Sequence, residues 1–134
     1  MTDEKSAAEL ARLASAPYVS LETFRRSGVG VATPVWCAAE GGAVYVFSAG
    51  EAGKVKRLRN GDRARLAACD VRGRLLGAWH DARAVLVDDP AEIERALAAL
   101  RRKYGWQMGL ADLGAKLTGR FARRAYIRVE LTGS

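Results

Sequence analysis

The residues best suited to bind an anion lie in segment 48–58, which reads SAGEAGKVKRL. Glycines in such a loop let backbone N–H groups approach a ligand, and the start of a helix offers unpaired N–H donors at the positive end of its dipole. Lys54 at that start and Arg57 one turn later add two charges on one side. The segment predicts a phosphate-binding loop, with a solvated basic helix after a flexible loop as the alternative. It is not a P-loop, because Ser48 and Val55 stand where that pattern needs Gly and Ser/Thr.

A second candidate is the run Thr33-Pro34-Val35-Trp36. Proline donates no ladder hydrogen bond, so this point of an expected strand should be a sheet edge or a bulge. Its backbone could form an edge against which a planar ring lies. The alternative is a proline on an edge strand beside a core tryptophan.

The other chemically active side chains form no recognisable site. His80 is the only histidine, and no cysteine or acidic cluster at metal spacing accompanies it, so neither a zinc site nor a catalytic triad is supported. We expect it to be a surface or strand histidine. Cys37 and Cys69 lie in separate expected strands without a C-x-x-C pair, which indicates small buried hydrophobic residues in a reducing compartment.

Six strands and several helices are expected to position these residues. A capping-box pattern at Ser6 and Glu9 predicts a helix over 7–14, and Asp89 with Pro90 predicts the start of another. A short helix is expected over 54–60, and a basic amphipathic stretch covers 107–124. The expected strands are 18–26, 29–39, 43–48, 63–69, 75–87 and 125–131.

These strands are joined mostly by tight turns, which indicates antiparallel pairing. Strands and helices do not alternate along the chain, which argues against a Rossmann sheet. The sequence therefore predicts a mainly β protein, a small six-stranded antiparallel barrel with peripheral helices. The length of 134 residues fits a single domain, 1–134, with the barrel over about 17–131.

The net charge of +7 divides into two local excesses. Segment 54–74 carries +6 and segment 101–128 carries +7, whereas every other part of the chain is acidic. This pattern indicates local anion sites on an acidic body rather than a uniformly basic surface. Nucleic-acid binding has some support from arginines alternating with tryptophan and tyrosine, but no known module signature occurs.

The sequence also bears on membranes and location. No apolar run approaches the roughly 18 residues that a membrane span needs. Acidic residues at the N-terminus argue against a signal peptide, so we expect a cytoplasmic protein. The stretch 107–124 could lie on a membrane surface with Trp106 as an anchor, but a helix packed on a barrel has the same amphipathic pattern.

Several short motifs follow one another in a specific order. They are Thr33-Pro34-Val35-Trp36, Val44-Tyr45-Val46-Phe47-Ser48, Gly53-Lys54-Val55-Lys56-Arg57-Leu58, Ala68-Cys69-Asp70 with Arg72-Gly73-Arg74, and Arg102-Lys103-Tyr104-Gly105. The ordered set resembles the deazaflavin-dependent branch of the pyridoxamine 5′-phosphate oxidase-like split β-barrel proteins. The resemblance implies a homodimer with a cofactor in each of two clefts at the subunit interface. It also implies coenzyme F420, a hydride-carrying 5-deazaflavin, as the cofactor.

The resemblance implies roles for particular residues. Lys54 and Arg57 would hold the cofactor phosphate, and Ser48 and the Gly53 backbone would complete that pocket. The strand Thr33-Pro34-Val35-Trp36 would line the deazaflavin ring. Lys56 and Arg59 would follow the acidic glutamate tail of the cofactor.

The expected activity is that of an F420-dependent oxidoreductase, which transfers a hydride between C5 of the deazaflavin and a small organic acceptor such as an unsaturated carbonyl. The first alternative is an FMN-binding oxidase or reductase of the same fold. FMN-using oxidases place an arginine near position 33 and another beside the phosphate-binding lysine, where this chain has Thr33 and Gly53, which weakens that alternative. The second is a protein that binds or carries F420 without turnover, and the third is nucleic-acid binding.

Overall fold

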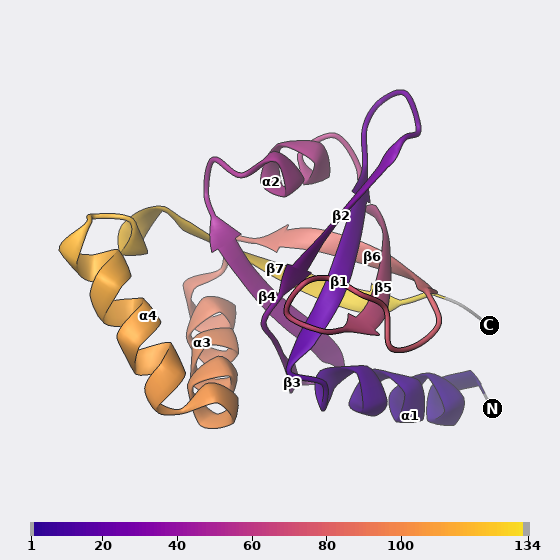
Figure 1. Ribbon diagram of the computed structural model, residues 1–134, viewed down its shortest axis with the longest axis horizontal. Coiled ribbons are helices and arrows are strands. Elements are labelled where there is room, and N and C mark those ends of the chain that lie inside the picture. Colours follow the sequence, from indigo (N-terminus) through magenta and orange to yellow (C-terminus); the bar gives the residue numbers. More distant parts are fainter. Residues whose placement is uncertain (1, 133–134) are drawn as a thin grey trace.

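Seven antiparallel strands form one curled sheet in the computed structural model, which describes residues 2–132 (Figure 1). The order across the sheet is β2-β1-β5-β6-β7-β4-β3. The strands are β1 (Tyr18–Phe24), β2 (Gly30–Val35), β3 (Cys37–Glu40), β4 (Ala43–Ala49), β5 (Arg63–Cys69), β6 (His80–Val87) and β7 (Arg124–Leu131). The expected antiparallel, mainly β architecture is confirmed.

The sheet curls because its two edge strands are consecutive in the chain. β2 and β3 stand at opposite ends of the strand order, yet only Trp36 separates Val35 from Cys37. Two peptide units span no more than about 7 Å, so the two edges must meet at this point. The curled sheet therefore forms a partly closed barrel, whose two edge strands meet at Trp36.

The expected number of six strands is wrong, because the strand expected over 29–39 is two strands. β2 pairs with β1 and β3 pairs with β4, so the chain changes neighbours at Trp36. Of the sheet edge or bulge expected at Pro34, no bulge occurs, because β2 pairs with β1 without a break from Gly30 to Val35. β2 is an edge strand, as the proline predicted, and Pro34 pairs with Ser20 without needing to donate a second ladder bond.

The long strand expected over 75–87 is also shorter than predicted. β6 begins only at His80, and residues 70–79 form a turn and a loop with a single bridge between Cys69 and Leu75. The Asp70 carboxylate fixes the turn by accepting the backbone N–H groups of Arg72 and Arg74, both at 2.9 Å. Gly73 has φ +86°, a conformation that favours glycine.

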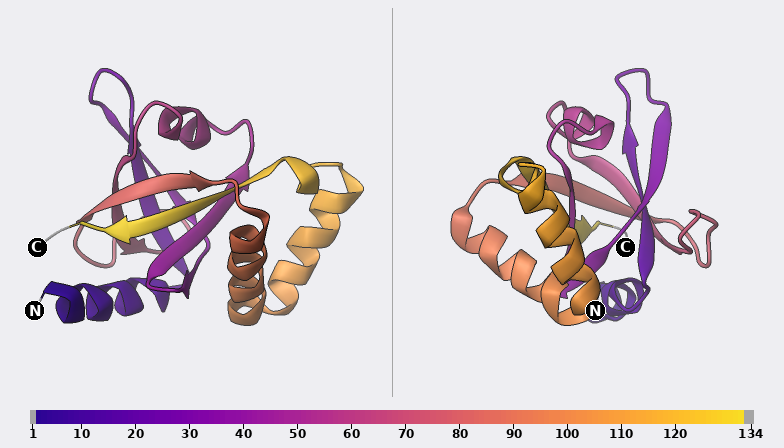
Figure 2. Two further views of the ribbon diagram at one scale, coloured as in Figure 1. Left: turned by 180° about the vertical axis from the view of Figure 1, so that it is seen from behind. Right: turned by 60° about the vertical axis from the view of Figure 1, so that its left-hand side comes forward.

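The helices surround the sheet at its ends and on one side. They are α1 (Thr2–Ala14), α2 (Gly53–Leu58), α3 (Pro90–Tyr104), α4 (Trp106–Leu117) and the 3₁₀ turn Phe121–Arg123. Figure 2 shows α1 and α2 at opposite ends of the sheet, with α3 beside it and α4 outside α3. No helix among residues 2–132 is long and apolar enough to cross a membrane.

Helix starts follow the sequence signals only in part. Asp89 caps α3, accepting the Ala91 N–H at 3.2 Å, with Pro90 in the first turn as expected. The capping-box prediction for the first helix is wrong, because α1 begins at Thr2 and Ser6 lies inside it. The short helix expected over 54–60 begins one residue earlier and ends at Leu58.

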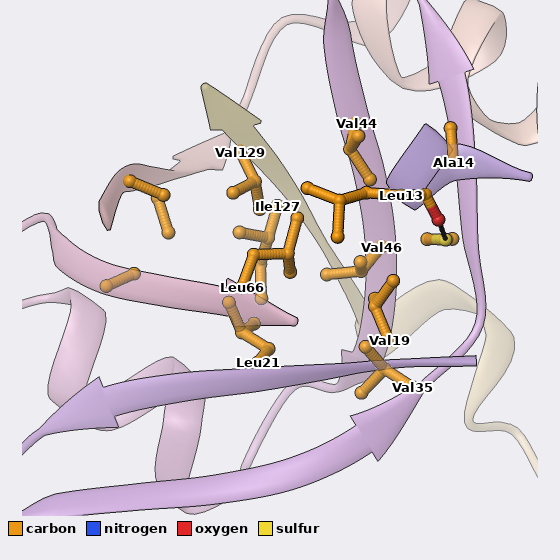
Figure 3. Close-up of a cluster of buried hydrophobic side chains, with 14 of the residues drawn as sticks. Leu13, Ala14, Val19, Leu21, Val35, Val44, Val46, Leu66, Ile127 and Val129 are labelled. Atoms are coloured by element: carbon orange, nitrogen blue, oxygen red, sulfur yellow. Dashed lines mark hydrogen bonds between the residues drawn. The ribbon is translucent and has the colours of Figure 1, made fainter. Parts of the chain in front are cut away.

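The inward faces of the strands build the main core (Figure 3). Val19, Leu21 and Thr23 are fully buried on one face of β1, as their alternation predicted. Leu66 and Ile127 meet them from β5 and β7, and α1 contributes to the same cluster. Each fully buried Leu, Ile or Val side chain stabilises the fold by roughly 1.5–3 kcal/mol.

A second core lies between α3, α4 and the outer face of β3, β4 and β7. Its largest members are Tyr45, Leu100, Tyr104, Met108 and Tyr126. The Tyr104 hydroxyl donates to the Pro17 carbonyl at 2.8 Å and accepts the Cys37 N–H at 2.9 Å. The end of α3 is thus bonded to Pro17, just before β1, and to Cys37, just after β2.

Candidate functional site

The helix α2 lies against β1 and β6 at one end of the sheet and carries two cations (Figure 1). Val55 and Leu58 are buried beneath it, which leaves Lys54 and Arg57 one turn apart and half-buried on another side. No side chain caps the helix at Ala52. The arrangement is the one predicted for segment 48–58, a short helix after a glycine-containing loop.

Arg57 is held in place from two directions. Its Nε donates to the Thr23 hydroxyl at 2.6 Å, and Thr23 is fully buried on β1. Its Nη1 folds back to the start of the helix, where a Cβ on Gly53 would lie 2.8 Å from it. A side chain at position 53 would therefore move the guanidinium from the place it occupies here.

The two cations have no carboxylate partner within ion-pair distance among the side chains of residues 7–132. Burial and the neighbouring Arg57 lower the pKa of Lys54, and burial with the nearby Arg25 lowers the pKa of Arg57. Positive groups brought together and partly desolvated destabilise one another unless an anion is present. The geometry therefore favours an anionic ligand.

The Thr33 hydroxyl is the buried polar atom that lacks a partner among the described side chains. Thr33 lies opposite Leu21 on β1, and Val31 lies opposite Thr23, so all four side chains share the inner face. Thr33 is therefore two residues, about 7 Å, along the strand from the point that anchors Arg57. An unpaired buried hydroxyl costs about 1–3 kcal/mol, and a ligand with a polar edge would remove that cost.

The other residues expected to line a ring have different surroundings. Pro34 is exposed on the outer side of β2, and Val35 is part of the main core. Trp36 packs in the second core, with its ring 4.5 Å from that of Tyr104 in a stacked arrangement. Of this run, the Thr33 side chain is the one that presents an unused polar atom on the inner face.

The other predicted phosphate and tail residues also lie in different places. Ser48 lies near the end of β4, opposite Ala125, and its hydroxyl donates to the Ala49 carbonyl at 3.3 Å. Lys56 and Arg59 are exposed on the outer side of α2. The structure brings Gly53, Lys54 and Arg57 together, and it leaves Ser48 with a local contact.

Sequence reasoning missed a basic hollow that continues past Arg57. It has a volume of about 130 Å³ and is lined by Phe24, Arg25, Arg26, Arg57, Asn60, Gly61 and Arg63. Arg26 donates to the Asn60 side chain at 3.4 Å, and Arg63 stacks over the Phe24 ring at 3.9 Å. The adjacent Arg25 and Arg26 were the available signal, but they lie in a segment whose net charge is negative.

His80 and the cysteines have the surroundings that the sequence indicated. His80 is the first residue of β6, half-buried, with Nε2 3.6 Å from the Glu9 carboxylate. Cys37 and Cys69 are free thiols buried in separate strands, and burial raises the pKa of both. Within residues 2–132, no three His, Cys, Asp or Glu side chains are grouped as a metal ion would require.

Comparison with known proteins identifies the fold. No protein-family model and no curated protein matches the chain. Solved structures do match, among them a Listeria innocua protein assigned as a pyridoxamine 5′-phosphate oxidase, with TM-score 0.66, 14% identity, and coverage of 98% of this chain and 94% of that one. The chain has their split-barrel fold.

Two further split barrels show how varied such proteins are. A FAD-binding protein from Mesorhizobium loti has TM-score 0.62 and 18% identity, covering 95% of this chain and 88% of that one. The heme storage protein HutZ from Vibrio cholerae has TM-score 0.69 and 11% identity, covering 95% and 90%. Their names mention different cofactors, so the cofactor must be argued from this chain's own residues.

Proposed function

We propose that this split barrel is an F420-dependent oxidoreductase that transfers a hydride between the deazaflavin C5 and a small, electron-poor organic molecule such as an unsaturated carbonyl. The observation that carries the proposal is the pair Lys54 and Arg57 on α2, which has no acidic partner among the described side chains. Arg57 is anchored to Thr23 on the inner face of the sheet that also carries the unpaired Thr33 hydroxyl. A cofactor with a phosphate and a ring with a polar edge fits both features.

The residues fit such a cofactor as follows. Lys54 and Arg57 would hold the phosphate, and Gly53 would keep the space in which Arg57 folds back. The Thr33 hydroxyl would bond the polar edge of the ring, and the backbone of β2 would orient it. When bound, the reduced deazaflavin supplies the hydride, and the protein contributes position and electrostatics.

The basic hollow supports a deazaflavin rather than FMN. FMN carries one phosphate, which Lys54 and Arg57 would satisfy. Arg25, Arg26 and Arg63 extend the positive charge beyond Arg57, and the glutamate tail of F420 carries the additional carboxylates that suit it. Lys56 and Arg59 would follow the tail farther out, from the exposed side of α2.

FMN is the second candidate cofactor, favoured by the names of the similar structures. A FAD-binding protein and a pyridoxamine 5′-phosphate oxidase assignment both occur among them. An FMN protein would be yellow as purified and would show flavin absorbance. A colourless preparation that binds F420 supports the deazaflavin.

The proposed assembly is a homodimer with the cofactor between the subunits. Its support is the open side of the site: Lys54 and Thr33 are only half-buried, and Pro34 is exposed beside them. A second subunit would cover this side and exclude water from the ring.

Fluorescence titration with F420 and with FMN tests the proposal. Wild-type protein should bind F420 more tightly than FMN. Lys54→Ala should weaken F420 binding by about 10- to 100-fold, because a charge-assisted bond to phosphate contributes about 1.5–3 kcal/mol. Lys116→Ala removes the same charge from α4 and should bind like wild type. Failure of both cofactors to bind below roughly millimolar concentration would contradict the proposal.

Turnover distinguishes an enzyme from a carrier. Reduced F420 should be oxidised in the presence of protein and at least one acceptor from a panel of unsaturated carbonyls and related compounds. The decrease in turnover on Lys54→Ala should follow the decrease in binding. Tight F420 binding without oxidation by any acceptor would instead assign a carrier.

A further inference from the structure

The outer face of α4 carries an apolar stripe that nothing in the described chain covers. Trp106, Leu110, Leu113 and Leu117 are exposed by 74, 60, 54 and 79%. Their spacing of four, three and four residues places them on one side of the helix. The opposite side of α4 is already packed, with Met108 and Asp112 buried against the rest of the protein. Figure 1 and the left view of Figure 2 show α4 on the far side of α3 from the sheet.

α4 is fixed in this orientation. The Asp112 carboxylate accepts from Arg124 at 2.8 Å and from Arg101 at 3.0 Å, which ties the helix to β7 and to α3. Rotation of α4 to bury the stripe would break both contacts and expose Met108. The stripe therefore needs a partner outside this chain.

Two glycines flank the stripe, one on each side. Gly109 and Gly114 are exposed, and a Cβ at either position would meet no atom within 4 Å. Glycine is a poor helix former compared with alanine, and nothing within the described chain requires its small size at these positions. Small residues on a helix face allow the backbone of a second helix to approach closely.

The pattern is symmetric about the midpoint between residues 111 and 112. Leu110 mirrors Leu113, Trp106 mirrors Leu117, and Gly109 mirrors Gly114. A twofold axis through that midpoint would pair each large apolar residue with another, and each glycine with a glycine, on an antiparallel copy of the same helix. Self-complementarity of this kind is what an isologous interface requires.

We propose that α4 pairs antiparallel with α4 of a second copy of this chain. Charge supports this occupant: none of the four stripe residues is charged, and the exposed charged residue of α4, Lys116, lies over the Phe121 ring of its own chain. A protein of net charge +7 therefore meets its own copy with least repulsion on this stripe. A lipid surface is less suited: it would gain nothing from the glycines, and α4 contains one basic residue, Lys116. The inference does not depend on the proposed cofactor.

Sedimentation velocity of the full chain over a concentration series tests the inference. Leu113→Glu places a charge near the symmetry axis, and Gly109→Leu pushes the two helices apart. Each should halve the mass of the assembly and raise its dissociation constant by about tenfold or more. Leu76→Glu replaces an exposed leucine far from α4 and should change nothing.

Gly109→Leu also separates assembly from folding. A Cβ at this position meets no atom of its own chain within 4 Å, and leucine favours the helix more than glycine does. The thermal midpoint of the dissociated variant should therefore not fall below that of dissociated Leu113→Glu. A wild-type protein that stays a single copy at every concentration, or an assembly that both variants leave intact, overturns the inference. Binding to anionic vesicles that Leu113→Glu abolishes would assign the stripe to a lipid surface and overturn it too.

F420 titration of the same proteins keeps the two proposals apart. If the assembly depends on α4 and F420 does not bind, only the proposed function fails. If F420 binds and the α4 variants leave the assembly unchanged, only this inference fails.

Discussion

At the residue scale, two threonines on one face of the sheet differ in whether their hydroxyl groups have a hydrogen-bond partner. The Thr23 hydroxyl accepts a bond from Arg57, whereas the Thr33 hydroxyl has no partner among the described residues. Both are buried atoms on neighbouring strands. The contrast makes Thr33 the residue whose removal should affect a ligand more than the fold.

Thr33→Val should therefore stabilise the ligand-free protein, or leave it unchanged, and weaken F420 binding. Removing an unsatisfied buried hydroxyl is worth up to about 1 kcal/mol in the free energy of unfolding, and losing its bond to the ring should lower affinity by about fivefold. Chemical denaturation and fluorescence titration measure the two effects.

Thr23→Val is the matched comparison. It leaves the Arg57 Nε without its partner, so the free energy of unfolding should fall by about 1–2 kcal/mol. A Thr33→Val protein that is equally destabilised, with F420 affinity unchanged, would show that the Thr33 hydroxyl does not face the cofactor.

At the scale of elements, α3, α4 and β7 are joined by one buried carboxylate. The Asp112 and Arg124 side chains are 8% and 6% exposed, whereas that of Arg101 is half-exposed. Burial alone would raise the pKa of Asp112, but the bonds from Arg124 and Arg101 outweigh it and hold that pKa below its usual value. The ionised form of Asp112 therefore stabilises the fold.

Asp112→Asn should lower the free energy of unfolding by about 3 kcal/mol at neutral pH, because it leaves a buried guanidinium without its counter-charge. A carboxylate with a lowered folded pKa stabilises above its unfolded pKa of about 4 and loses that contribution as pH falls through the folded value. The difference from wild type should therefore shrink below about pH 4. Urea denaturation at several pH values measures it.

Asp88→Asn, at an exposed loop position, is the control for that experiment. It should change the free energy of unfolding by less than about 0.5 kcal/mol. A difference between Asp112→Asn and wild type that stays constant down to low pH would mean that the ionised carboxylate is not the stabilising form.

A lysine ties further elements together. Lys103 Nζ donates to the backbone carbonyls of Ala14, Ala16 and Cys37 at 2.6, 2.6 and 2.7 Å. It thus joins the end of α3 to the end of α1 and to β3. Three acceptors match the three N–H donors of an ammonium group, so this charge is used inside the fold.

At the scale of the whole molecule, the two basic segments have different uses. In 101–128, Arg101, Arg124 and Arg128 bond carboxylates, and Lys103 bonds carbonyls. In 54–74, the cations of α2 have no acidic partner among the described residues. The larger of the two charge excesses is thus mainly structural. In the smaller one, Arg65 and Arg74 also bond carboxylates, and the cations of α2 are the ones left for a ligand.

The different uses of the two basic segments predict weak binding to nucleic acid. Fluorescence anisotropy with a labelled duplex should show no saturable binding at physiological salt, because the cations that remain gather around α2 and the hollow of about 130 Å³ beside it, which suits a small anion better than a duplex backbone. The same duplex at low salt should not compete with F420. Tight binding that falls steeply with salt, and that competes with F420, would instead assign the α2 cations to nucleic acid.

The sequence by itself determined the local features whose causes are local. The alternation of Val19, Leu21 and Thr23 predicted a half-buried strand, Asp89-Pro90 predicted a helix start, and Pro34 predicted an edge strand. Lys54 and Arg57 were expected one turn apart on a short helix, since spacing along one helix is enough to place them together. Each depends on residues within a few positions of one another.

Tertiary structure alone decided how distant segments meet. The change of strand partner at Trp36 left no mark in an apolar run, because the two neighbours, β1 and β4, are set by the curl of the whole sheet. The orphaned Thr33 hydroxyl and the basic hollow arise only when β1, β2 and α2 come together. The exposed side of α4 could not be read from its amphipathic pattern either, because Asp112, a charged residue, turned out to face inward, held there by arginines from α3 and from the start of β7.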